Sequence, residues 1–520
     1  MIIFVNIMKK IFLALFSGFL LALSWPSIGI SFIIFLAFVP LLILEDEAKN
    51  GREVFGYSYI SFFIFNIITT YWVWYSTPLG SVFAFVVNSF LMSIAFYAFY
   101  KIKKITSNRL GYIAFIVTWL SFEYLHLNWD LSWPWLMLGN VFAESVPFIQ
   151  WYEFTGVLGG SFWVLIINLL VFLSIKSKKK IKVFLLSLLL LLIPAGISYY
   201  FYITKDDIVS KGETINTLII QPNIDPYTHK FNVGYEEQLQ DFIFLARSKL
   251  DQETDLLIGP ETVLQESIWE NNIEATYSIR VLRKLQEEFP NLNILVGAST
   301  YKMFEHDEQK TSTARKIRNQ EIFYDAYNSA IFIPDSGDVD VYHKTKLVPG
   351  AEKTPYPFIL DKLAKVMIDL GGISGSLGSE NKLSNFNFNG KNIRPLICYE
   401  SIYGEMEFNN SELIAIITND GWWKNTAGYK QHFSYARLRS IEQRKVIIRS
   451  ANTGISGVIL PNGKVLKKTK WDEEICIKAS VSINNHSTFY ARFGDYIGRL
   501  SLFISVIFIM VSFIKARLRK

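Results

Sequence analysis

The sequence predicts a polytopic α-helical membrane domain of eight spans joined to an α/β domain. Eight apolar stretches lead to the first half of this prediction, because several approach the roughly 20 apolar residues that cross a bilayer. A long polar segment with short strand-like runs leads to the second half. Of the 520 residues, 51% are hydrophobic and 19% are charged, which is typical of a membrane protein that carries a polar domain. The domains we predict are residues 1–204 (seven spans), 205–495 (polar domain) and 496–520 (last span and basic tail).

The membrane part starts close to the N-terminus. The predicted spans occupy residues 11–24, 28–44, 54–75, 81–100, 112–127, 159–175, 183–203 and 496–514. Trp25 and Pro26 predict a tight hairpin between the first two spans. Lys9 and Lys10 could belong to a signal peptide, but no small-x-small cleavage site precedes the second apolar run, so we expect the first span to be retained.

Lysine and arginine occur only in alternate loops, and this sets the orientation. The basic segments are residues 9–10, 49–52, 101–109, 176–182 and the C-terminal tail, whereas residues 25–29, 77–80 and 126–156 contain neither. We therefore expect both termini in the cytoplasm and the polar domain on the outer side. The net charge of +6 comes largely from these loops, so we expect no nucleic-acid partner.

The loop at 126–156 is rich in aromatic residues, including four tryptophans. These rings could form an aromatic belt at the level of the lipid headgroups, or a shelf that contacts lipid beneath the outer domain. The sequence leaves both interpretations open.

Within the polar domain, apolar runs of four to eight residues predict strands, and longer runs with helical periodicity predict helices. The predicted strands are 215–223, 256–258, 292–297, 328–334, 340–342, 392–397, 413–419 and 445–450, and the predicted helices are 237–250, 275–288 and 432–444. Residues 349–384 are rich in Gly, Pro and Ser and predict long loops that cover a cleft.

Three chemically active residues each follow one of these strands: Glu261, Lys344 and Cys398. Taken singly, each has an ordinary explanation: a helix-start charge, a solvated basic turn and a small buried hydrophobe. For the neighbouring Lys346 we keep the ordinary explanation. Together the three residues make a set for acyl transfer. Glu261 can take the proton of a thiol whose pKa is near 8.5, and the ammonium of Lys344 can favour the thiolate and then stabilise an oxyanion.

Cysteine and histidine usage points away from other chemistries. The chain has two cysteines, so we expect no disulfide framework, and Cys476 lies in an alternating strand-like run where it should be inert. The six histidines show no metal-ligand spacing, and we predict neither a metal nor a cofactor.

Glu, Lys and Cys at three strand ends, in that chain order, resemble the nitrilase superfamily over residues 215–481. The resemblance implies an α-β-β-α sandwich with Glu261 as base, Lys344 as oxyanion stabiliser and Cys398 as nucleophile.

A nitrilase-like domain held between seven spans and one also resembles the apolipoprotein N-acyltransferase family of the bacterial inner membrane. That family moves a fatty acyl chain from a phospholipid, typically phosphatidylethanolamine, to the α-amino group of a diacylated apolipoprotein. Its pattern implies supporting roles for Glu352, Tyr399 and Glu400, and an acyl-site lining by Trp422 and Trp423. Residues 349–355 depart from the family's common sequence motif around Glu352.

The family resemblance implies a periplasmic catalytic domain in a multi-pass inner-membrane protein, and we expect a monomer. A thioester on Cys398 would let two lipids use one site in turn. Two alternatives remain at this stage: a membrane-tethered amidase or nitrile hydrolase, and, more remotely, a non-catalytic transporter or receptor.

Overall fold

The computed structural model describes residues 2–204, 213–228, 232–305, 308–356, 376–380, 383–406 and 411–518. The chain divides by its contacts into two compact units. The first, the helical unit, comprises Met1–Trp74, Pro78–Lys205 and Thr488–Lys520, and the second, the α/β unit, comprises Tyr75–Thr77 and Asp206–Ser487. Most of the loop predicted at 349–384, and the predicted boundary at residue 205, lie outside the described residues.

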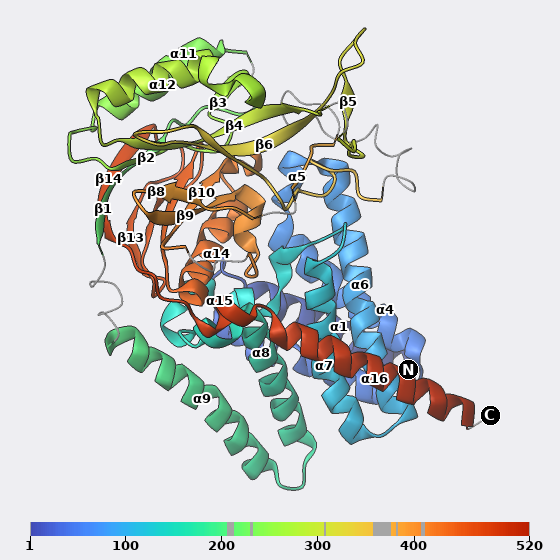
Figure 1. The fold of residues 1–520 in the computed structure, drawn as a ribbon. Coiled ribbons are helices and arrows are strands. Elements are labelled where there is room, and N and C mark those ends of the chain that lie inside the picture. The colour runs from blue at the N-terminus through green and yellow to red at the C-terminus, as the bar shows by residue number, and fades with distance from the viewer. Residues whose placement is uncertain are drawn as a thin grey trace. The chain divides into compact units, whose positions relative to one another are not determined.

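The helical unit is built from long helices with short connections (Figure 1). Its helices are α1 (Ile2–Leu23), η1 (Ser31–Ile33), α2 (Ile34–Ala37), α3 (Val39–Glu47), α4 (Gly51–Thr70), α6 (Pro78–Ile105), α7 (Asn108–Leu127), η2 (Pro134–Leu136), η3 (Leu138–Glu144), η4 (Val146–Phe148), α8 (Tyr152–Lys176), α9 (Lys180–Thr204), α15 (Phe489–Phe493) and α16 (Tyr496–Leu518). The short helix α5 (Val73–Ser76) follows α4.

Among the described residues, six helices are long and apolar enough to cross a membrane: α1, α6, α7, α8, α9 and α16. The other two predicted spans differ from this pattern. The span predicted at 28–44 is broken into the short helices η1, α2 and α3. The span predicted at 54–75 corresponds largely to α4, which is long enough but less apolar, because its buried face carries Asn66, Thr69 and Thr70.

Ion pairs join the predicted basic loops within the helical unit. Lys9 pairs with Glu47 at 2.7 Å and Lys10 with Glu53 at 2.5 Å. Two further lysines reach the same acidic segment: Lys103 pairs with Glu45 at 2.5 Å, and Lys176 pairs with Asp46. Four segments that the positive-inside pattern assigns to one side are therefore held at one end of this unit.

The aromatic loop at 126–156 packs into the helical unit. Trp135, Phe142 and Tyr152 are buried, and Phe142 contacts the ring of Trp163 on α8 at 5.2 Å. These three rings are core residues, whereas Trp129, Trp133, Phe148 and Trp151 are half-buried, so for those four both interpretations stay predictions.

The α/β unit contains two sheets. Its strands are β1 (Thr214–Gln221), β2 (Leu256–Ile258), β3 (Leu264–Trp269), β4 (Asn293–Met303), β5 (Arg315–Lys316), β6 (Phe323–Ile333), β7 (Asp340–His343), β8 (Phe386–Phe388), β9 (Lys391–Ile397), β10 (Leu413–Thr418), β11 (Val446–Ala451), β12 (Gly457–Ile459), β13 (Val465–Lys468) and β14 (Ile475–Ser482). The first sheet runs β14-β1-β2-β4-β6-β5, with β3 on β4 and β7 on β6, and the second runs β13-β12-β11-β10-β9-β8.

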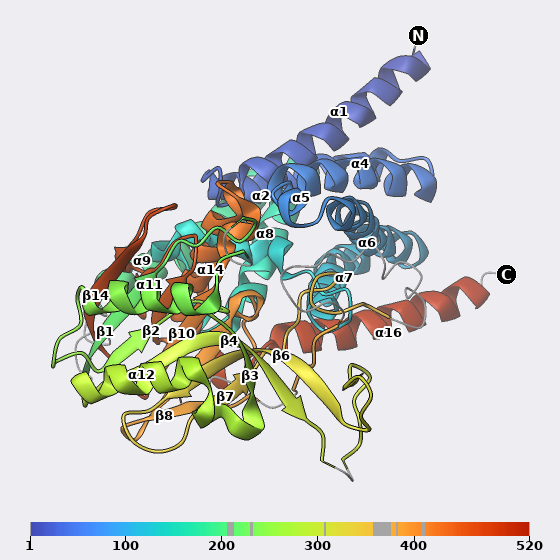
Figure 2. The same cartoon turned by 90° about the horizontal axis from the view of Figure 1, so that it is seen from above.

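Helices cover both outer faces of this pair of sheets. The helices are α11 (Tyr235–Arg247), η5 (Glu270–Ala275), α12 (Tyr277–Glu288), η7 (Cys398–Ile402), η8 (Asp420–Trp423) and α14 (Ala427–Gln443). Figures 1 and 2 both show α11 and α12 side by side over the first sheet, and α14 packs against β11 and β12 of the second.

Two apolar cores follow from this layering. One lies between the sheets and includes Ile219, Leu256, Ile397 and Ile448, and the other lies between the first sheet and its helices. The implied α-β-β-α arrangement is the one observed. Most of the central strands read as short apolar runs because both of their faces are buried.

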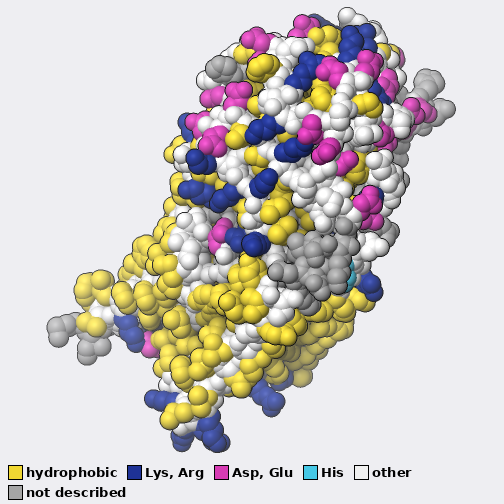
Figure 3. Space-filling view, turned by 90° about the vertical axis from the view of Figure 1, so that its left-hand side faces the viewer, with side chains coloured by type: hydrophobic (Ala, Val, Ile, Leu, Met, Phe, Trp, Pro, Cys, Tyr) yellow, Lys and Arg dark blue, Asp and Glu magenta, His cyan; other side chains and the backbone are white. Residues whose placement is uncertain are grey.

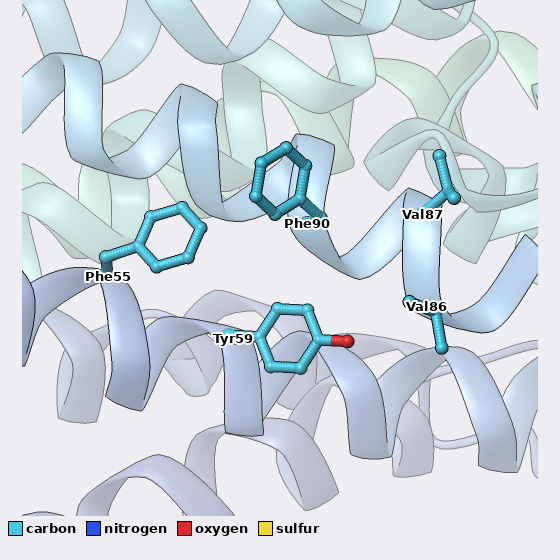
Figure 4. Close-up of a pocket in the computed structure, with 5 residues that line it drawn as sticks. All are labelled: Phe55, Tyr59, Val86, Val87 and Phe90. Atoms are coloured by element: carbon cyan, nitrogen blue, oxygen red, sulfur yellow. The ribbon is translucent and has the colours of Figure 1, made fainter.

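The two units differ in their surfaces. Large exposed hydrophobic side chains gather on the helical unit, whereas both signs of charge mix over the α/β unit on the face drawn in Figure 3. Between α4 and α6 lies an apolar pocket of about 330 Å³, lined by Phe55, Tyr59, Val86, Val87 and Phe90 (Figure 4). It contains none of the predicted site residues, and its lining is almost entirely apolar.

Candidate active site

Glu261 lies directly after β2, where Gly259 and Pro260 end the strand. Its carboxylate is buried and held by three donors. The Asn328 side chain donates to Oε1 at 2.7 Å, the Asn419 backbone N–H donates to Oε2 at 3.0 Å, and the Lys344 ammonium lies 3.4 Å from Oε1. A carboxylate with these fixed donors has a defined orientation, as a general base requires.

Lys344 is the first residue after β7, and its side chain is 1% exposed. Its ammonium donates to Oε1 of Glu352 at 2.7 Å and reaches Glu261 at 3.4 Å. Burial alone lowers the pKa of Lys344, but the two carboxylates and Cys398 outweigh burial and raise it. Lys344 is therefore a permanent cation at neutral pH.

Cys398 is the first residue of η7, directly after β9. Its backbone has φ 49°, in the left-handed region that L-residues rarely adopt. The turn bends the chain sharply between the strand and the helical turn, which is how a nucleophile is held at the end of a sheet. The strain of such a conformation costs of order 1–3 kcal/mol and is typical of functional sites.

The Cys398 thiol is not ionised in advance. Burial raises the pKa of Cys398, and the Glu261 carboxylate raises it further, whereas Lys344 and a hydrogen bond from Thr418 lower it. We expected the ammonium to favour the thiolate. It does so, but burial outweighs it, so the proton has to be removed by a base during the reaction.

Glu352 keeps its place beside Lys344 despite the unusual sequence around it. Its Oε1 accepts from Lys344 and, at 3.0 Å, from Asn328, and its Oε2 accepts from the Val348 N–H at 2.8 Å. Asn328 thus bridges the two carboxylates with one amide group. The departure at 349–355 leaves the contact between Glu352 and Lys344 intact.

Glu400 anchors the segment that follows Lys344. Its Oε1 accepts from the Tyr342 hydroxyl at 2.9 Å and from the Thr345 N–H and hydroxyl at 2.7 and 2.8 Å, with the Lys346 N–H at 3.3 Å. Its Oε2 accepts from the Ile397 N–H at 2.8 Å. Burial raises the pKa of Glu400 despite these donors. The carboxyl ties the end of β7 to the end of β9, and so ties Lys344 to Cys398.

The three aromatic residues lie around this centre with different surroundings. Tyr399 is buried with its ring edge-on to Tyr403 at 5.4 Å. Trp423 is largely buried and packs edge-on to His432 at 5.5 Å. Trp422 is half-buried, and its ring lies 5.7 Å from that of Tyr227. Both tryptophans belong to η8, which begins one residue after Asn419, a donor to Glu261.

The structure therefore brings Glu261, Lys344 and Glu352 into one hydrogen-bonded cluster, with Cys398 near enough to Lys344 for the ammonium to lower the pKa of the thiol. Sequence reasoning did not find Asn328 and Asn419. Both follow from one rule: a polar residue in or just after a buried strand needs a partner.

Chemically, this cluster suits acyl transfer. It offers a nucleophilic sulfur, a carboxylate that can accept its proton and a fixed cation for a developing oxyanion. Within the described ranges, no three His, Cys, Asp or Glu side chains gather as metal ligands would.

Comparison with known proteins gives matches to both parts of the chain. The carbon-nitrogen hydrolase family model matches residues 220–486, and the model of the apolipoprotein N-acyltransferase N-terminal domain matches residues 17–170. The curated apolipoprotein N-acyltransferase of Chlorobaculum tepidum is 29% identical over 98% of this chain and 97% of its own length. Those of Geobacter metallireducens and Thermotoga maritima are 27% and 26% identical, over 93% and 97% of this chain and 91% and 94% of theirs.

Proposed function

The chain belongs to the carbon-nitrogen hydrolase family, and from this premise we propose that it is a phospholipid–apolipoprotein N-acyltransferase. It moves a fatty acyl chain from a phospholipid to the α-amino group of the diacylglyceryl-cysteine at the N-terminus of an apolipoprotein. One observation carries the proposal. The chain has a buried Glu261–Lys344–Cys398 site, and its described part contains six span-length apolar helices. Its residues 17–170 match the N-terminal domain of such acyltransferases.

In the first half-reaction, Glu261 takes the proton of the Cys398 thiol as the sulfur attacks the ester carbonyl of the phospholipid. The carbonyl oxygen becomes an oxyanion, which the ammonium of Lys344 stabilises. The intermediate then collapses, the ester C–O bond breaks, and the leaving alkoxide takes the proton from Glu261. The products are a thioester on Cys398 and a lysophospholipid.

In the second half-reaction, the α-amine of the apolipoprotein attacks the thioester carbonyl. Glu261 takes a proton from the attacking amine, and Lys344 again faces the oxyanion. When the C–S bond breaks, the sulfur receives that proton and Cys398 returns to its neutral thiol. The base ends each half-reaction ionised, so one carboxylate serves both in a ping-pong sequence.

The remaining site residues support these steps. Glu352 holds Lys344 in place, and Glu400 fixes the segment behind it. Trp422 and Trp423 provide apolar surface for an acyl chain, and Tyr399 supports catalysis beside the nucleophile; these are the roles that the family pattern implies.

The two lipid substrates explain why such a site belongs on a membrane protein. Extracting an acyl chain from the bilayer costs about 0.8 kcal/mol per CH₂ group. We propose eight spans, with the broken segment of η1, α2 and α3 and the helix α4 completing the six span-length helices. The proposed arrangement is a monomer in the bacterial inner membrane, with residues 205–495 in the periplasm and phosphatidylethanolamine as the donor.

The experiment that tests the proposal is isolation of the acyl-enzyme. The purified protein is incubated with an acyl-labelled phospholipid and no acceptor, and its intact mass is measured. We expect one added acyl group, released by neutral hydroxylamine, absent in Cys398→Ala and present in the matched variant Cys476→Ala. A peptide with a diacylglyceryl-modified N-terminal cysteine should discharge it.

Two results would contradict the proposal. An adduct that persists in Cys398→Ala would place the acyl group elsewhere. Discharge by water as fast as by the peptide, or equal discharge by a peptide with a blocked α-amine, would favour a hydrolase.

A further inference from the structure

A lysine follows directly after the two tryptophans of η8 and lies between two tyrosine rings. The ammonium of Lys424 is 5.3 Å from the centre of the Tyr75 ring and 5.6 Å from that of the Tyr227 ring. The Tyr227 hydroxyl donates to the backbone carbonyl of Trp422 at 2.6 Å and lies 3.0 Å from that of Tyr75. All four residues belong to the α/β unit. We call Tyr75, Tyr227, Trp422 and Lys424 the lysine–aromatic cluster.

The backbone of Lys424 has a conformation that a lysine rarely adopts. Its φ is 51° and its ψ is −168°, in a region that favours glycine. Two hydrogen bonds fix this turn: the Lys424 N–H donates to the Gly421 carbonyl at 3.1 Å, and the Thr426 N–H donates to the Lys424 carbonyl at 2.8 Å. Strain of this kind concentrates at catalytic and binding sites. The turn therefore points to a functional reason for a long charged side chain at this position.

The charge of Lys424 is fixed in place but not neutralised. In the part of the chain that the structure describes, no ion pair joins its ammonium to a carboxylate. The neighbouring carboxylate of Asp225 accepts instead from the backbone N–H groups of Tyr227 and Thr228, at 2.7 and 3.1 Å. Contact with two ring faces orients the ammonium without using its hydrogens as donors to oxygen. Because Lys424 is exposed, the cluster presents a positive charge to an incoming ligand.

Lys424 also lies at the end of the segment that contacts the general base. The Asn419 N–H donates to Glu261, η8 follows, and Lys424 is the next residue after Trp423. In the proposed function, Trp422 and Trp423 line the acyl site. The phosphate and the reacting ester of a phospholipid share one glycerol, so a partner for the phosphate must lie beside the residues that hold the acyl chain. The position of Lys424 in the chain meets this condition.

Another member of the cluster lies next to a membrane span in the sequence. Tyr75 precedes Pro78 by three residues, and the span-length helix α6 begins at Pro78. Three residues reach at most about 11 Å, so Tyr75 lies close to the level of the lipid headgroups, where spans end. The outward loops predicted at 25–29, 77–80 and 126–156 contain no Lys or Arg. Lys424 supplies a cation that these loops lack.

We propose that Lys424 binds the phosphate of the phospholipid donor and so selects a phospholipid over an uncharged acyl ester. The inference rests on the proposed function, because it names the group that recognises the donor. The ammonium donates to a phosphate oxygen, while the rings of Tyr75 and Tyr227 hold its side chain. The diacylglyceryl-cysteine of the acceptor carries no phosphate. Lys424 is thus a specificity residue of the first half-reaction, and it takes no part in discharge of the thioester.

The test compares two acyl donors that differ by the phosphate-containing headgroup. Acyl-enzyme formation is measured in detergent micelles with a phosphatidylethanolamine and with a diacylglycerol of the same acyl chains. Lys424→Gly removes the ammonium and suits the positive φ, so this variant should fold at least as well as the wild type. We expect its KM for the phospholipid to rise roughly 10-fold, with kcat and the KM for the diacylglycerol unchanged. Lys424→Arg keeps the charge and should stay close to the wild type.

The matched control is Lys430→Gln. Lys430 is also exposed, and its ammonium lies 5.6 Å from the ring centre of Tyr429, but it is placed on α14. This variant should leave both KM values unchanged. A Lys424→Gly protein whose KM rises equally for both donors, or for neither, would overturn the inference. So would an unchanged KM for the phospholipid combined with slower discharge by the acceptor peptide, because the lysine would then serve the acceptor.

Binding without chemistry separates this inference from the proposed function. A Cys398→Ala protein should bind a short-chain phosphatidylethanolamine, measured by calorimetry, roughly 10-fold more tightly than the Cys398→Ala/Lys424→Gly protein does. If this difference is found but the wild type forms no acyl-enzyme, the proposed function fails and the phosphate site stands. If the acyl-enzyme forms but the difference is missing, the reverse holds. Displacement of the lipid by inorganic phosphate at an equal concentration would indicate a site for the free anion and would overturn the inference.

Discussion

Each charged group of the site is fixed by at least two partners. Two residues of the same chemistry, Glu261 and Glu352, therefore have different surroundings. Glu261 and Glu352 both contact Lys344, but the donors of Glu352 come from its own loop and from Asn328. Glu261 shares the Asn328 donor but also accepts from Asn419, just beyond β10 in the sheet that carries Cys398. Glu261 is therefore also anchored to the sheet that carries Cys398, whereas Glu352 is anchored to the segment that follows Lys344.

The first prediction at this scale concerns the base and the cation. Glu261→Gln removes proton abstraction and Lys344→Met removes the charge that faces the oxyanion, so each should slow acyl-enzyme formation at least roughly 10²-fold. Single-turnover kinetics with labelled phospholipid measure this. Lys346→Met is the matched control and should change the rate little. A dispensable Lys344 beside an essential Lys346 would reverse our assignment.

The second prediction concerns the backbone of the nucleophile. Glycine in a regular element is about 0.5–1 kcal/mol less stable than alanine, but at a positive φ the order reverses because alanine is crowded there. Cys398→Gly should therefore unfold at a higher temperature than Cys398→Ala, although both are inactive. Cys476 lies in β14 with ordinary backbone angles, so Cys476→Gly should be the less stable of its pair. The same order at both positions would mean that Cys398 is not strained.

At the scale of elements, Lys344 directly follows β7, and the last residue of β7, His343, is held between two carboxylates. We call His343, Glu270 and Glu380 the charged clamp. Nε2 of His343 lies 2.6 Å from Glu270, Nδ1 lies 2.8 Å from Glu380, and the ring stacks on Tyr327 with centroids 3.8 Å apart. Burial alone lowers the pKa of His343, but the two carboxylates outweigh burial and raise it. His343 in turn lowers the pKa of Glu380 to about 2.

The third prediction follows from the sign of that shift. A histidine with a raised pKa in the folded state stabilises the fold fully below its unfolded pKa of about 6.5, and this stabilisation is lost as the pH rises through the folded value. Glu380→Gln should therefore lower the thermal stability more at pH 6 than at pH 9. Glu321→Gln, in an exposed pair with Lys316, should show no such difference. Equal losses at both pH values would rule out the clamp.

Strands and helices whose apolar residues follow a regular spacing could be predicted from the sequence, whereas irregular elements could not. The strands before Glu261, Lys344 and Cys398 are confirmed at β2, β7 and β9. Strand β2 is an uninterrupted apolar run because it is fully buried, and β9 ends on the buried apolar residues Leu396 and Ile397. The predicted span at 28–44 was wrong as a single helix, since its apolar composition is equally suited to three short helices. Helix α14 begins at Ala427, five residues earlier than predicted, because Thr426 caps it by accepting from the Gly428 N–H.

The site could be predicted only in part for a similar reason. Glu261, Lys344 and Cys398 are conspicuous because charged or reactive residues seldom follow buried strands. Lys424 is one of many lysines in the chain, and its partners Tyr75 and Tyr227 come from distant segments. Contacts between three separate segments leave no spacing signal in one sequence.

At the scale of the whole molecule, the distribution of charge predicts the orientation. The ion pairs of Lys9, Lys10, Lys103 and Lys176 with residues 45–53 gather the basic loops at one end of the helical unit. Burying or translocating such a cluster is costly, so it should remain in the cytoplasm.

The fourth prediction tests this orientation. In a Cys398→Ala/Cys476→Ala background, single cysteines replace Lys178 and Lys310, which are both exposed. A membrane-impermeant maleimide should label position 310 in intact spheroplasts and position 178 only after the membrane is opened. Labelling of both positions from the same side would exclude the proposed topology.

Because β1 pairs with β14, the first strand of this sheet is synthesised long before its partner. Gln221 lies opposite Ile475, so roughly 250 residues must follow the first strand before its partner exists. At about 5–20 residues per second, the ribosome needs roughly 10 to 50 seconds to supply it. Throughout that interval one edge of the nascent sheet is open to wrong partners. We therefore expect that chaperones shield this edge while the chain is still being made, and that their shortage reduces the yield of this protein before it affects its activity.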